Sequence, residues 1–340
     1  MMRKRVTLKD VAEAVGVHPS TVSRALDPRT QDLINPKVVQ RIVEASQKLH
    51  YRPNAAAYSL RTNRSRTIGV IVPDIANPIF PPMIRGIEAT LLKKGYYAIL
   101  GNTDGDMARE RELVQAFISR GIDGLILASV NREDDAVQEA LASGTPVVTV
   151  NRRIDDERVS SVVHMEDEGI FRALTHLVSL GHKRVAFVAG PQAVSTGAER
   201  LSAFRRHGES LGIAIEPGLT VIASAYSEAE GEHCIEELIA RGASFTAVMC
   251  ANDRLAVGVI AALGRRDLRC PEDISVTGYN DMPMVDRIQP PLTTVQIRQY
   301  DMGVEAGGLA LSMIDGEAEP RHVVLPVQLV IRNSTRALPR

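Results

Sequence analysis

The first fifty residues repeat apolar positions with the period of an α-helix. Apolar residues spaced i, i+3, i+4 and i+7 predict a first helix over about 8–15: Leu8, Val11, Ala12 and Val15. Thr7 and Asp10 form a variant of the capping box that begins a helix, because each side chain can bond to the other residue's backbone N–H. Gly16 is the residue type best able to end this helix with a positive φ.

Two more helices are predicted after a tight turn at Gly16 and Val17. His18 takes the capping position of the second helix and Pro19 its first helical position. Its inward residues are Val22, Ala25 and Leu26, and its outward residues are Ser20, Ser23 and Arg24. A third helix begins at Asn35 and Pro36, with a predicted buried stripe of Val38, Ile42, Ala45 and Leu49. Three short helices with a tight turn between the first two predict a helix-turn-helix.

From Thr67 onward, short runs of β-forming residues alternate with amphipathic segments. The runs are 68–72, 97–101, 124–129, 146–151, 160–163, 184–190, 219–223, 247–251, 275–279, 292–297 and 323–330. This alternation predicts doubly wound parallel sheets, and there are too many strands for one sheet and about the right number for two. The sequence therefore predicts an α/β protein: a small all-α headpiece followed by two lobes that face each other across a cleft.

The formal net charge of −1 hides an asymmetry along the chain. Residues 1–66 contain thirteen Lys or Arg against five Asp or Glu, a net charge of +8, and the remainder carries −9. A basic module this small has the electrostatic footprint of a protein that binds the phosphate backbone of nucleic acid, since each cation releases a condensed counterion. The alternative is a basic face that is merely solvated.

In doubly wound sheets, ligands bind beyond the carboxyl ends of the strands. The residues just past the predicted strands are therefore candidates for a binding site in the cleft: Asn77, Phe80, Asn151, Arg152, Thr196, Arg200, Tyr226, Asn252, Asp253, Asn280 and Asp281. An aromatic face, amides and an arginine suit a hydroxyl-rich ligand with a planar face, such as a sugar. The ring stacks on one side while the polar groups bond to the edges.

Two stretches, VTLKDVAEAVGVHPSTVSRAL (6–26) and HYRPNAAAYSLRTNRSRTIGVIVPDIANPIF (50–80), resemble the lactose-repressor (LacI/GalR) family of bacterial transcriptional regulators. The resemblance continues to the closing PVQLVIRNSTR and covers essentially the whole chain. It implies a core with the two-lobed fold of periplasmic binding proteins. We therefore expect a helix-turn-helix DNA-binding headpiece (1–52), a hinge helix and linker (53–66), and a two-lobed effector-binding and dimerisation domain (67–340).

The resemblance implies that the second helix enters the major groove of DNA. The positions that match the family's base-reading residues are Pro19, Ser20 and Arg24. Arg24 can pair with guanine through both O6 and N7, whereas Pro19 and Ser20 are expected to contribute shape and apolar contact. The alternative for Arg24 is a phosphate clamp. The full set of DNA-binding candidates is Thr7, Pro19, Ser20, Thr21, Ser23, Arg24, Asn54, Ala57 and Leu60.

The hinge of the resembling family folds on DNA and inserts a leucine into the minor groove. Residues 55–60 contain good helix formers but are too few for a stable helix in water, so the hinge helix is expected to be conditional. Leu60 matches the inserted leucine, and the kinked DNA can offset the cost of unstacking a base step by touching more protein. The alternative is that Leu60 is a packing residue under the core.

Within the cleft, the resemblance assigns roles to four candidates. They match the family's sugar-clamping arginine, stacking aromatic, ligand amide and a polar neighbour: Arg200, Tyr226, Asn252 and Thr196. Where many members have an aspartate in a GYDD-like motif, this chain has Asn280. A neutral Asn280, with Arg152 and Arg153 near the cleft, favours a sugar acid more than in a typical member. The alternative for both arginines is a solvated loop charge.

Motifs of enzymes are absent from the sequence. It has no G-x-x-x-x-G-K-[ST] loop, no G-x-S-x-G elbow and no H-E-x-x-H, and its eight histidines are scattered. We therefore expect no catalytic residues, no cofactor and no metal site. The basic start lacks the apolar stretch of a signal peptide, and no run approaches transmembrane length, so we expect a cytoplasmic protein without a membrane partner. The rivals, a periplasmic sugar-binding protein and an α/β enzyme, lack their defining features here.

One helix-turn-helix reads about half of a DNA site. We therefore expect a two-fold homodimer on a near-palindromic double-stranded operator, with the sensor lobes forming the isologous interface. An effector bound between the lobes would change whether the two hinges can pair, a coupling of about 1–3 kcal/mol. The family's majority behaviour favours an inducer, and hence a repressor that a small sugar or sugar acid releases; a co-repressor is the alternative.

Overall fold

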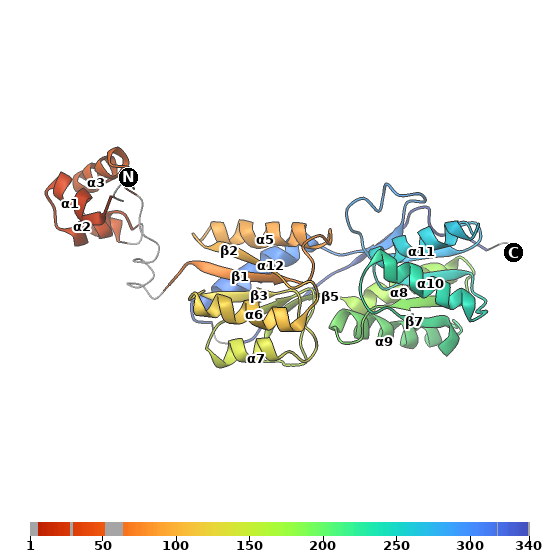
Figure 1. The fold of residues 1–340 in the computed structure, drawn as a ribbon. Helices are drawn as coiled ribbons and strands as arrows, with labels where there is room; N and C mark the ends of the chain where they lie inside the picture. Colours follow the sequence, from red (N-terminus) through yellow and green to blue (C-terminus); the bar gives the residue numbers. More distant parts are fainter. Residues whose placement is uncertain (1–5, 28–29, 52–63, 318, 339–340) are drawn as a thin grey trace, which may run out of the picture. The chain divides into compact units, whose positions relative to one another are not determined.

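A computed structural model describes residues 6–27, 30–51, 64–317 and 319–338 of the chain. The chain divides into two compact units, Met1–Ser65 and Arg66–Arg340, and each is described here by itself. The first unit is all-helical and the second contains every strand of the described chain (Figure 1).

The described part of the first unit contains three α-helices and one 3-10 turn around a small apolar core. They are α1 (Leu8–Val15), α2 (Pro19–Ala25), η1 (Gln31–Leu33) and α3 (Pro36–Lys48). Each α-helix contributes one fully buried side chain to this core: Val11, Val22 and Ile42. The helical period of the sequence therefore predicted all three helices, and α1 has the predicted bounds.

Side-chain caps fix the ends of these helices. The Thr7 N–H donates to Asp10 Oδ2 at 2.7 Å and the Asp10 N–H donates to Thr7 Oγ1 at 3.4 Å, which is the predicted capping box. Gly16 ends α1 with φ 70°, a conformation that glycine adopts without strain. Asn35 caps α3 by accepting the Lys37 N–H at 3.0 Å. Local hydrogen bonds thus set the boundaries that the sequence indicated.

The buried stripe of α3 differs slightly from the predicted one. Val39, Ile42 and Ser46 are its buried residues, while Val38, Ala45 and Leu49 are half-buried. The reason is that α3 packs against both α1 and α2, so the most enclosed line on α3 runs between the two contacts instead of along the most apolar line.

Lobe 1 of the second unit is built on a six-stranded sheet with the order β11-β5-β4-β3-β1-β2, and all of its pairs are parallel. Its strands are β1 (Thr67–Val72), β2 (Tyr97–Asn102), β3 (Gly124–Leu127), β4 (Val147–Val150), β5 (Ser160–His164) and β11 (His322–Leu325). Its helices are α5 (Phe80–Leu92), α6 (Met107–Ser119), α7 (Asp135–Ala142) and α12 (Gln299–Ile314). Helices α5 and α12 cover one face of the sheet and α6 and α7 the other (Figure 1).

Lobe 2 repeats this plan with the strand order β12-β10-β9-β8-β6-β7. Its strands are β6 (Val185–Ala189), β7 (Thr220–Ile222), β8 (Ala247–Cys250), β9 (Ser275–Asn280), β10 (Thr293–Gln296) and β12 (Gln328–Val330). Its helices are α8 (Glu166–Ser179), α9 (Ser195–Ser210), α10 (Glu228–Ala240) and α11 (Asp253–Arg265), with a 3-10 turn η2 (Pro217–Leu219). Helices α8 and α9 cover one face, and α10 and α11 cover the other.

The sequence was wrong about the last β run, 323–330. It forms two strands, because Pro326 cannot donate to a ladder and the chain leaves lobe 1 there: β11 pairs with β5, and β12 pairs with β10 in lobe 2. The pairing of β12 with β10 is antiparallel. The sheet of lobe 2 is therefore mixed, whereas a wholly parallel sheet was predicted.

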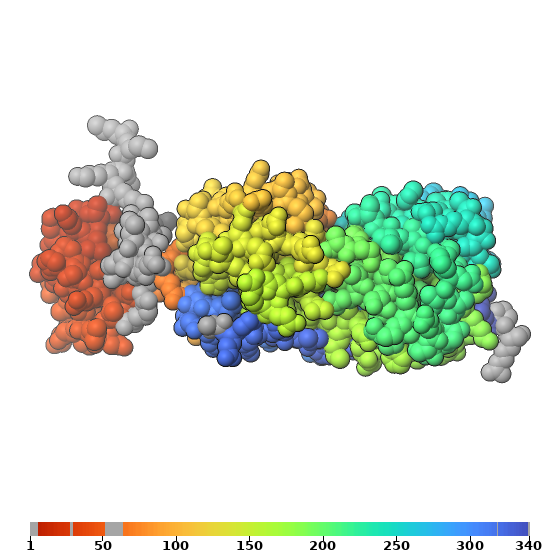
Figure 2. Space-filling view, turned by 90° about the horizontal axis from the view of Figure 1, so that it is seen from below, coloured from red at the N-terminus to blue at the C-terminus, as the bar shows by residue number. Residues whose placement is uncertain are grey.

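Within the described residues, the chain passes between the lobes three times. The passages follow β5 at Met165, β10 at 297–298 and β11 at 326–327. As a result α12 and β11, from the C-terminal part of the sequence, lie with the residues of lobe 1, and their blue atoms adjoin the orange and yellow ones in Figure 2. Three passages make a hinge between two otherwise separate sheets.

Close packing of α5 on α12 joins the beginning and the end of lobe 1. A Cβ atom at Gly86 would lie 2.2 Å from the Tyr300 carbonyl oxygen, and one at Gly303 would lie 2.0 Å from the Met83 carbonyl oxygen. Only glycine fits at both points, so the two helix backbones touch. This contact holds the returning C-terminal segment in lobe 1.

Candidate functional site

The outer face of α2 carries the predicted base-reading residues. Arg24 is exposed, and its guanidinium has no hydrogen-bond or ion-pair partner among the described residues. Pro19 is half-buried at the first position of the helix, and the Ser20 hydroxyl lies 2.7 Å from His18 Nδ1. Because Ser20 N–H also donates to this nitrogen, at 3.2 Å, the ring cannot be the donor there and the Ser20 hydroxyl gives it its hydrogen. Arg24 is thus the one of the three whose donors are all available.

The other DNA-binding candidates divide into two groups. Thr7 is exposed but engaged in the capping box, where its hydroxyl donates to Asp10 Oδ2 at 2.9 Å, and Thr21 and Ser23 are half-buried beside the outer face of α2. Asn54, Ala57 and Leu60, with most of the predicted hinge, lie outside the described residues.

In the second unit, one pocket between the lobes brings together the predicted effector residues. Nine of the eleven candidates that follow the predicted strands line it: Asn77, Phe80, Asn151, Arg152, Thr196, Arg200, Tyr226, Asn252 and Asn280. Ile79 also lines the pocket, and its aliphatic side chain provides no polar or aromatic signal by which it could have been predicted. The residues follow β1 and β4 in lobe 1 and β6, β7, β8 and β9 in lobe 2, so the carboxyl ends of two parallel sheets face each other.

Arg200 forms the centre of the lobe 2 wall. Its Nε and Nη2 donate to the two carboxylate oxygens of Glu166 at 2.6 and 3.0 Å, and its Nη1 donates to the Ala251 carbonyl oxygen at 2.5 Å. Burial by itself lowers the pKa of Arg200, but the adjacent Glu166 outweighs it and the pKa is raised. The guanidinium therefore stays charged, and two of its five N–H hydrogens have no partner among the described residues.

The position of Arg200 depends on residues that the sequence did not reveal as functional. Its guanidinium carbon lies 3.7 Å from the centre of the Tyr279 ring, which supports it from below. The ring fits because Gly169 of α8 has no side chain: a Cβ there would be 2.3 Å from the Tyr279 hydroxyl oxygen. Glu166 could have been suspected, since it follows a buried strand directly, but only the tertiary structure pairs it with Arg200.

Two asparagines offer opposite hydrogen-bonding groups to the pocket. Asn252 caps α11, and its side-chain oxygen accepts the Leu255 N–H at 2.9 Å, so only its NH2 group remains for a ligand. Asn280 ends β9 with φ 113°, and its buried Oδ1 has no hydrogen-bond partner among the described residues. The first therefore supplies a donor and the second an acceptor.

Tyr226 and Thr196 form a polar pair beside Arg200. The two hydroxyl oxygens are 3.2 Å apart. The Tyr226 ring reaches this point because Gly190 leaves room, since a Cβ at Gly190 would be 2.1 Å from the Tyr226 hydroxyl oxygen. Burial raises the pKa of Tyr226, so its hydroxyl remains protonated and can both donate and accept.

The lobe 1 wall contains a second buried arginine. Arg152 Nη1 donates to the Ser129 carbonyl oxygen at 3.0 Å, and its buried Nε has no partner among the described residues. Burial lowers the pKa of Arg152. Phe80, 1% exposed, supplies the apolar face, and the Asn77 side chain accepts the Ile79 N–H at 3.3 Å and so shapes the loop. The buried Asn151 has φ 67°, a conformation that asparagine tolerates better than most residues.

Three further residues from the sequence analysis do not line the pocket. Asp253 is fully buried and accepts the Thr294 hydroxyl and the Met282 N–H, and burial raises its pKa to about 7. Asp281 forms an ion pair with Arg332 at 2.7 Å. Arg153 is paired with Glu199 at 2.8 Å. The first two are structural, and Arg153 lies near the cleft, as expected, but is paired with Glu199 and does not line the pocket.

Contacts across the cleft hold the lobes together on both sides of the pocket. On one side the Arg153 N–H donates to Ser195 Oγ at 3.0 Å, next to the Arg153–Glu199 ion pair. On the other, Arg254 of lobe 2 bonds to Asp74 of lobe 1 at 3.0 Å. The pocket between them has a volume of about 30 Å³, enough for one or two water molecules. A larger ligand can enter only if the walls move apart.

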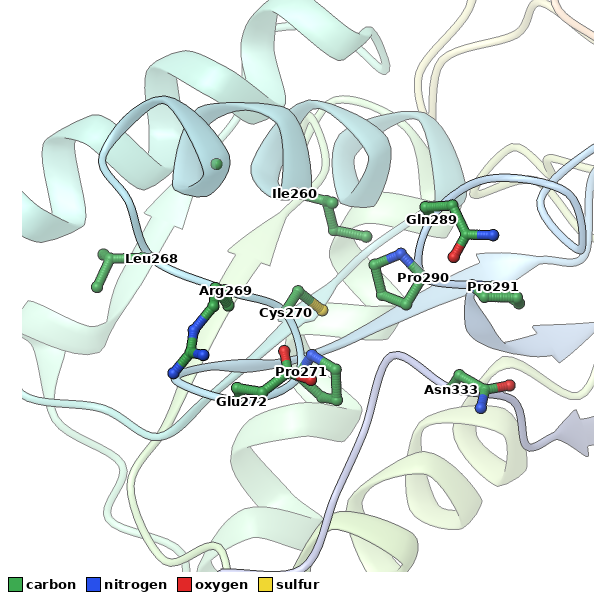
Figure 3. Close-up of a pocket in the computed structure, with 11 residues that line it drawn as sticks. Ile260, Leu268, Arg269, Cys270, Pro271, Glu272, Gln289, Pro290, Pro291 and Asn333 are labelled. Atoms are coloured by element: carbon green, nitrogen blue, oxygen red, sulfur yellow. The ribbon is translucent and has the colours of Figure 1, made fainter.

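A larger hollow elsewhere lacks the features of a small-molecule site. It has a volume of about 770 Å³ and lies in lobe 2 beside α11, where Figure 3 shows Pro271 and Pro290 facing Ile260 and Asn333. Arg269 points away along the surface and is paired with Asp273 at 3.1 Å. None of the described residues that line this hollow is a buried charged group, so its size does not make it the candidate site.

Metal and membrane sites were also sought in the described part of the chain. No group of three or more His, Cys, Asp or Glu side chains there could hold a metal ion. None of the helices between residues 6 and 338 that the structure describes has the length and apolar character needed to cross a membrane.

Comparison with known proteins identifies the family. Residues 7–54 match the model of bacterial regulatory proteins of the lacI family, and residues 174–335 match a periplasmic binding protein-like domain. Over 339 residues the chain is 32% identical to the HTH-type transcriptional repressor CytR of Escherichia coli K12, covering 98% of this chain and 97% of the relative. The chain belongs to the LacI family. This LacI-family protein is thus a DNA-binding transcriptional regulator and not an enzyme, as predicted.

Solved structures of LacI-family proteins share its fold. The lac repressor dimer bound to operator and the anti-inducer ONPF is 26% identical, with a TM-score of 0.86, over 98% of this chain and 100% of the other. A LacI family regulator from Enterococcus faecium with bound ribose is 31% identical, with a TM-score of 0.70, over 80% of this chain and 100% of the other. The predicted two-lobed core with a helical headpiece is confirmed.

Proposed function

We propose that this protein is a cytoplasmic repressor that binds a near-palindromic operator and is released from it by a small sugar or sugar acid held between the lobes. The observation that carries the effector part is the convergence of these nine candidate residues, from both lobes, on one buried pocket. The solved relatives with ribose or with operator and anti-inducer support the same two partners.

The pocket's free groups indicate the chemistry of the effector. They include donors on Arg200, Arg152 and Asn252, an acceptor on Asn280, and hydroxyls on Thr196 and Tyr226 that can do either. The buried ring of Phe80 adds an apolar face. A ligand that satisfies donors and acceptors spaced around one apolar face is polyhydroxylated and compact, as a monosaccharide is.

DNA recognition is assigned to the outer face of α2. Arg24 is the residue for base reading, with Pro19, Ser20, Thr21 and Ser23 beside it. Thr7 is assigned to the phosphate backbone, because the first turn of α1 offers backbone N–H groups to anions. The hinge, residues 53–66, is assigned to the minor groove through Asn54, Ala57 and Leu60, which leaves 1–52 as the headpiece and 67–340 as the effector and dimerisation domain.

An apolar strip at the edge of lobe 1 suits the interface of a homodimer. β2 is an edge strand, and Tyr97, Ile99 and Leu100 on it are 65%, 40% and 39% exposed, with Leu92 of α5 at 47% beside them. A two-fold interface needs one self-complementary patch of this kind. Pairing of two lobe 1 edges would place two headpieces on one operator, where movement of lobe 1 against lobe 2 alters their spacing.

Selection of bound duplexes from a random DNA pool, with and without a pooled extract of small metabolites, tests the proposal. A near-palindrome that is enriched alone and lost with the extract is the expected result. Enrichment only with the extract would make the effector a co-repressor, and no enrichment in either condition would contradict operator binding. Tyr226→Phe, which removes one pocket hydroxyl and keeps the ring, should weaken release by the extract, whereas Arg24→Ala should relax the enriched sequence at the base pair that Arg24 reads.

A further inference from the structure

A buried carboxyl that plays no part in the proposed site lies directly behind its lobe 1 wall. Glu110, in the first turn of α6, is 0% exposed. Its Oε1 accepts the Ser129 hydroxyl at 2.7 Å, and its buried Oε2 has no partner among the described residues. A carboxylate in this position would have only one hydrogen bond, which is far less than its charge requires.

Glu110 shares Ser129 with the pocket residue Arg152. The Ser129 hydroxyl bonds to Glu110, and the Ser129 carbonyl oxygen accepts from Arg152. Both side chains therefore contact the same residue, and each has a buried polar atom for which the described residues offer no partner. In surroundings with little water, the positive charge of Arg152 favours the ionised form of Glu110 and so lowers its pKa.

The charged groups around Glu110 oppose one another. Asp134, which caps α7, repels its negative charge, and Arg152, which follows β4, attracts it. Asp135 acts on Asp134 in turn. Burial, reinforced by Asp134, raises the pKa of Glu110 to about 7, so both protonation states are accessible near neutral pH.

The opposite wall has no such freedom. Arg200 is held by both oxygens of Glu166, and the pair is only 3% exposed on each side, so its charges cancel. The net charge that a ligand meets is therefore decided in lobe 1. Protonation of Glu110 makes the charge behind this wall more positive by one unit, and ionisation of Glu110 reverses the change.

We propose that Glu110 sets the charge selectivity of the effector pocket: a ligand with a carboxylate binds with Glu110 protonated, and a neutral sugar binds with Glu110 in either protonation state. The inference rests on the proposed effector site and deepens it. Binding of the anion takes up one proton, which leaves the solvent or buffer and ends on Glu110. Glu110 acts through Arg152 and is a positioning residue, so its signature is a pH profile.

The pH profile has a defined sign. An anion near Arg152 favours protonated Glu110, so the affinity for the anion is highest below about pH 7 and falls by up to about tenfold per pH unit above it. The affinity for a neutral sugar changes little over the same range. Glu110→Gln removes the titration and keeps an acceptor for Ser129, so its affinity for the anion should be pH-independent and equal to that of the wild type at low pH.

Calorimetric titration of the full chain with D-glucuronate and D-glucose tests the ligand side. These probes share a ring and differ only in a carboxylate against a CH2OH group. Measurements at about pH 6 and about pH 8, in two buffers of different ionisation enthalpy, give the affinity and the number of protons taken up. Glu112→Gln, on the exposed side of the same helix, is the matched control and should behave as the wild type. Glucuronate binding without proton uptake or pH dependence overturns the proposal.

Infrared difference spectra of wild type against Glu110→Gln, without ligand, test the coupling itself. The C=O band of a protonated carboxyl should disappear near pH 7 in the wild type. It should persist to higher pH, by about one unit or more, in Arg152→Met, because the cation that favours the carboxylate is gone; Arg152→Lys keeps the charge and should stay near the wild-type midpoint. A midpoint that does not move overturns the inference. If the midpoint moves as expected and neither sugar binds, the link between Glu110 and Arg152 stands and the proposed effector class is wrong.

Discussion

Two buried arginines face the same pocket from opposite lobes, and their surroundings differ. Arg200 in lobe 2 has a carboxylate bonded to it twice, a backbone carbonyl at its third nitrogen and an aromatic ring beneath it. Arg152 in lobe 1 has one backbone acceptor, the Ser129 carbonyl oxygen, and its Nε has no partner within the described part of the chain; the Glu110 carboxyl bonds to the Ser129 hydroxyl instead of to Arg152. Arg200 is thus fully paired with a carboxylate, whereas the negative charge near Arg152 depends on whether Glu110 is protonated.

The difference shows how one pocket can combine fixed hydrogen-bond donors in one wall with a charge that can change in the other. A fully paired buried arginine presents fixed donors, because moving it would break several bonds at once. A half-paired one leaves a polar atom that a ligand can satisfy, and its electrostatic effect depends on its neighbour's protonation. Lobe 2 therefore fixes the orientation of an effector, and lobe 1 selects its charge. The predictions below test this contrast.

The largest loss of stability is expected when the buried ion pair of Arg200 and Glu166 is broken. Glu166→Gln leaves the charge of Arg200 buried without a counter-charge and should lower the free energy of unfolding by about 3–5 kcal/mol. Urea unfolding of the full chain measures it. Glu168→Gln, which breaks a half-exposed i,i+4 pair with Arg172 on the same helix, should cost less than about 1 kcal/mol. Equal small losses in both would show that Arg200 does not depend on Glu166.

A pH-dependent effect on stability is expected at Glu110, which lies behind Arg152. Glu110 has a pKa raised from 4.5 to about 7 in the folded protein, so the folded state holds a proton that the unfolded state has lost. Stability therefore falls as pH rises through this interval, by up to about 1.4 kcal/mol per unit and about 3 kcal/mol in all, and is flat above it. Relative to Glu110→Gln, the wild type should show this loss in urea unfolding at a series of pH values. A constant difference between the two proteins would contradict the raised pKa.

A third arginine, Arg24, has no partner among the headpiece residues that the structure describes and should not contribute to stability. Arg24→Ala should leave the free energy of unfolding within about 0.5 kcal/mol of the wild type. It should lose about 1–3 kcal/mol of discrimination between the selected operator and one with a single substituted base pair, measured by fluorescence anisotropy. Uniform weakening on both duplexes, with a lower salt dependence, would instead mark a phosphate clamp.

The smallest effect is expected at the ion pair across the cleft. Asp74→Asn removes the lobe 1 partner of Arg254, which keeps Glu228 in its own lobe, and should cost less than about 1 kcal/mol because the pair is partly exposed. Small-angle scattering should show a slightly larger mean separation of the lobes. Asp104→Asn, which breaks a pair with Arg109 inside lobe 1, should leave the separation unchanged. The same scattering curve for both variants and the wild type would rule out a role of Asp74 in closure.

Several features of the fold could be predicted because they depend on neighbours in sequence. The capping box of Thr7 and Asp10, the positive φ of Gly16 and the period of α1 are all decided within one or two helical turns. The prediction for the run 323–330 was wrong because its division depends on residues that are distant in sequence. Its composition is that of one strand, and only the separation of the two sheets divides it between β11 and β12.

The candidate pocket could be predicted as a set of residues but not as a set of interactions. The rule that ligands bind at the carboxyl ends of strands placed Asn77, Arg200 and Asn280 together without any contact being known. It could not show that the oxygen of Asn252 is taken by the helix that it caps. Nor could it show that Arg153, near the same cleft, forms an ion pair instead of lining the pocket.

By itself the sequence determined the three helices of the headpiece, the alternation of strands and helices, the separation of charge along the chain, and which polar residues end the strands. These follow from periodicity, capping and composition, which are local properties. The tertiary structure alone decided that Glu166 neutralises Arg200, that Tyr279 supports it through the space left by Gly169, and that Glu110 lies behind Arg152. Each of these contacts joins residues that are more than about thirty positions apart in the sequence or that lie on different elements. The charge of a buried group depends on which groups the fold brings next to it and not on its place in the chain.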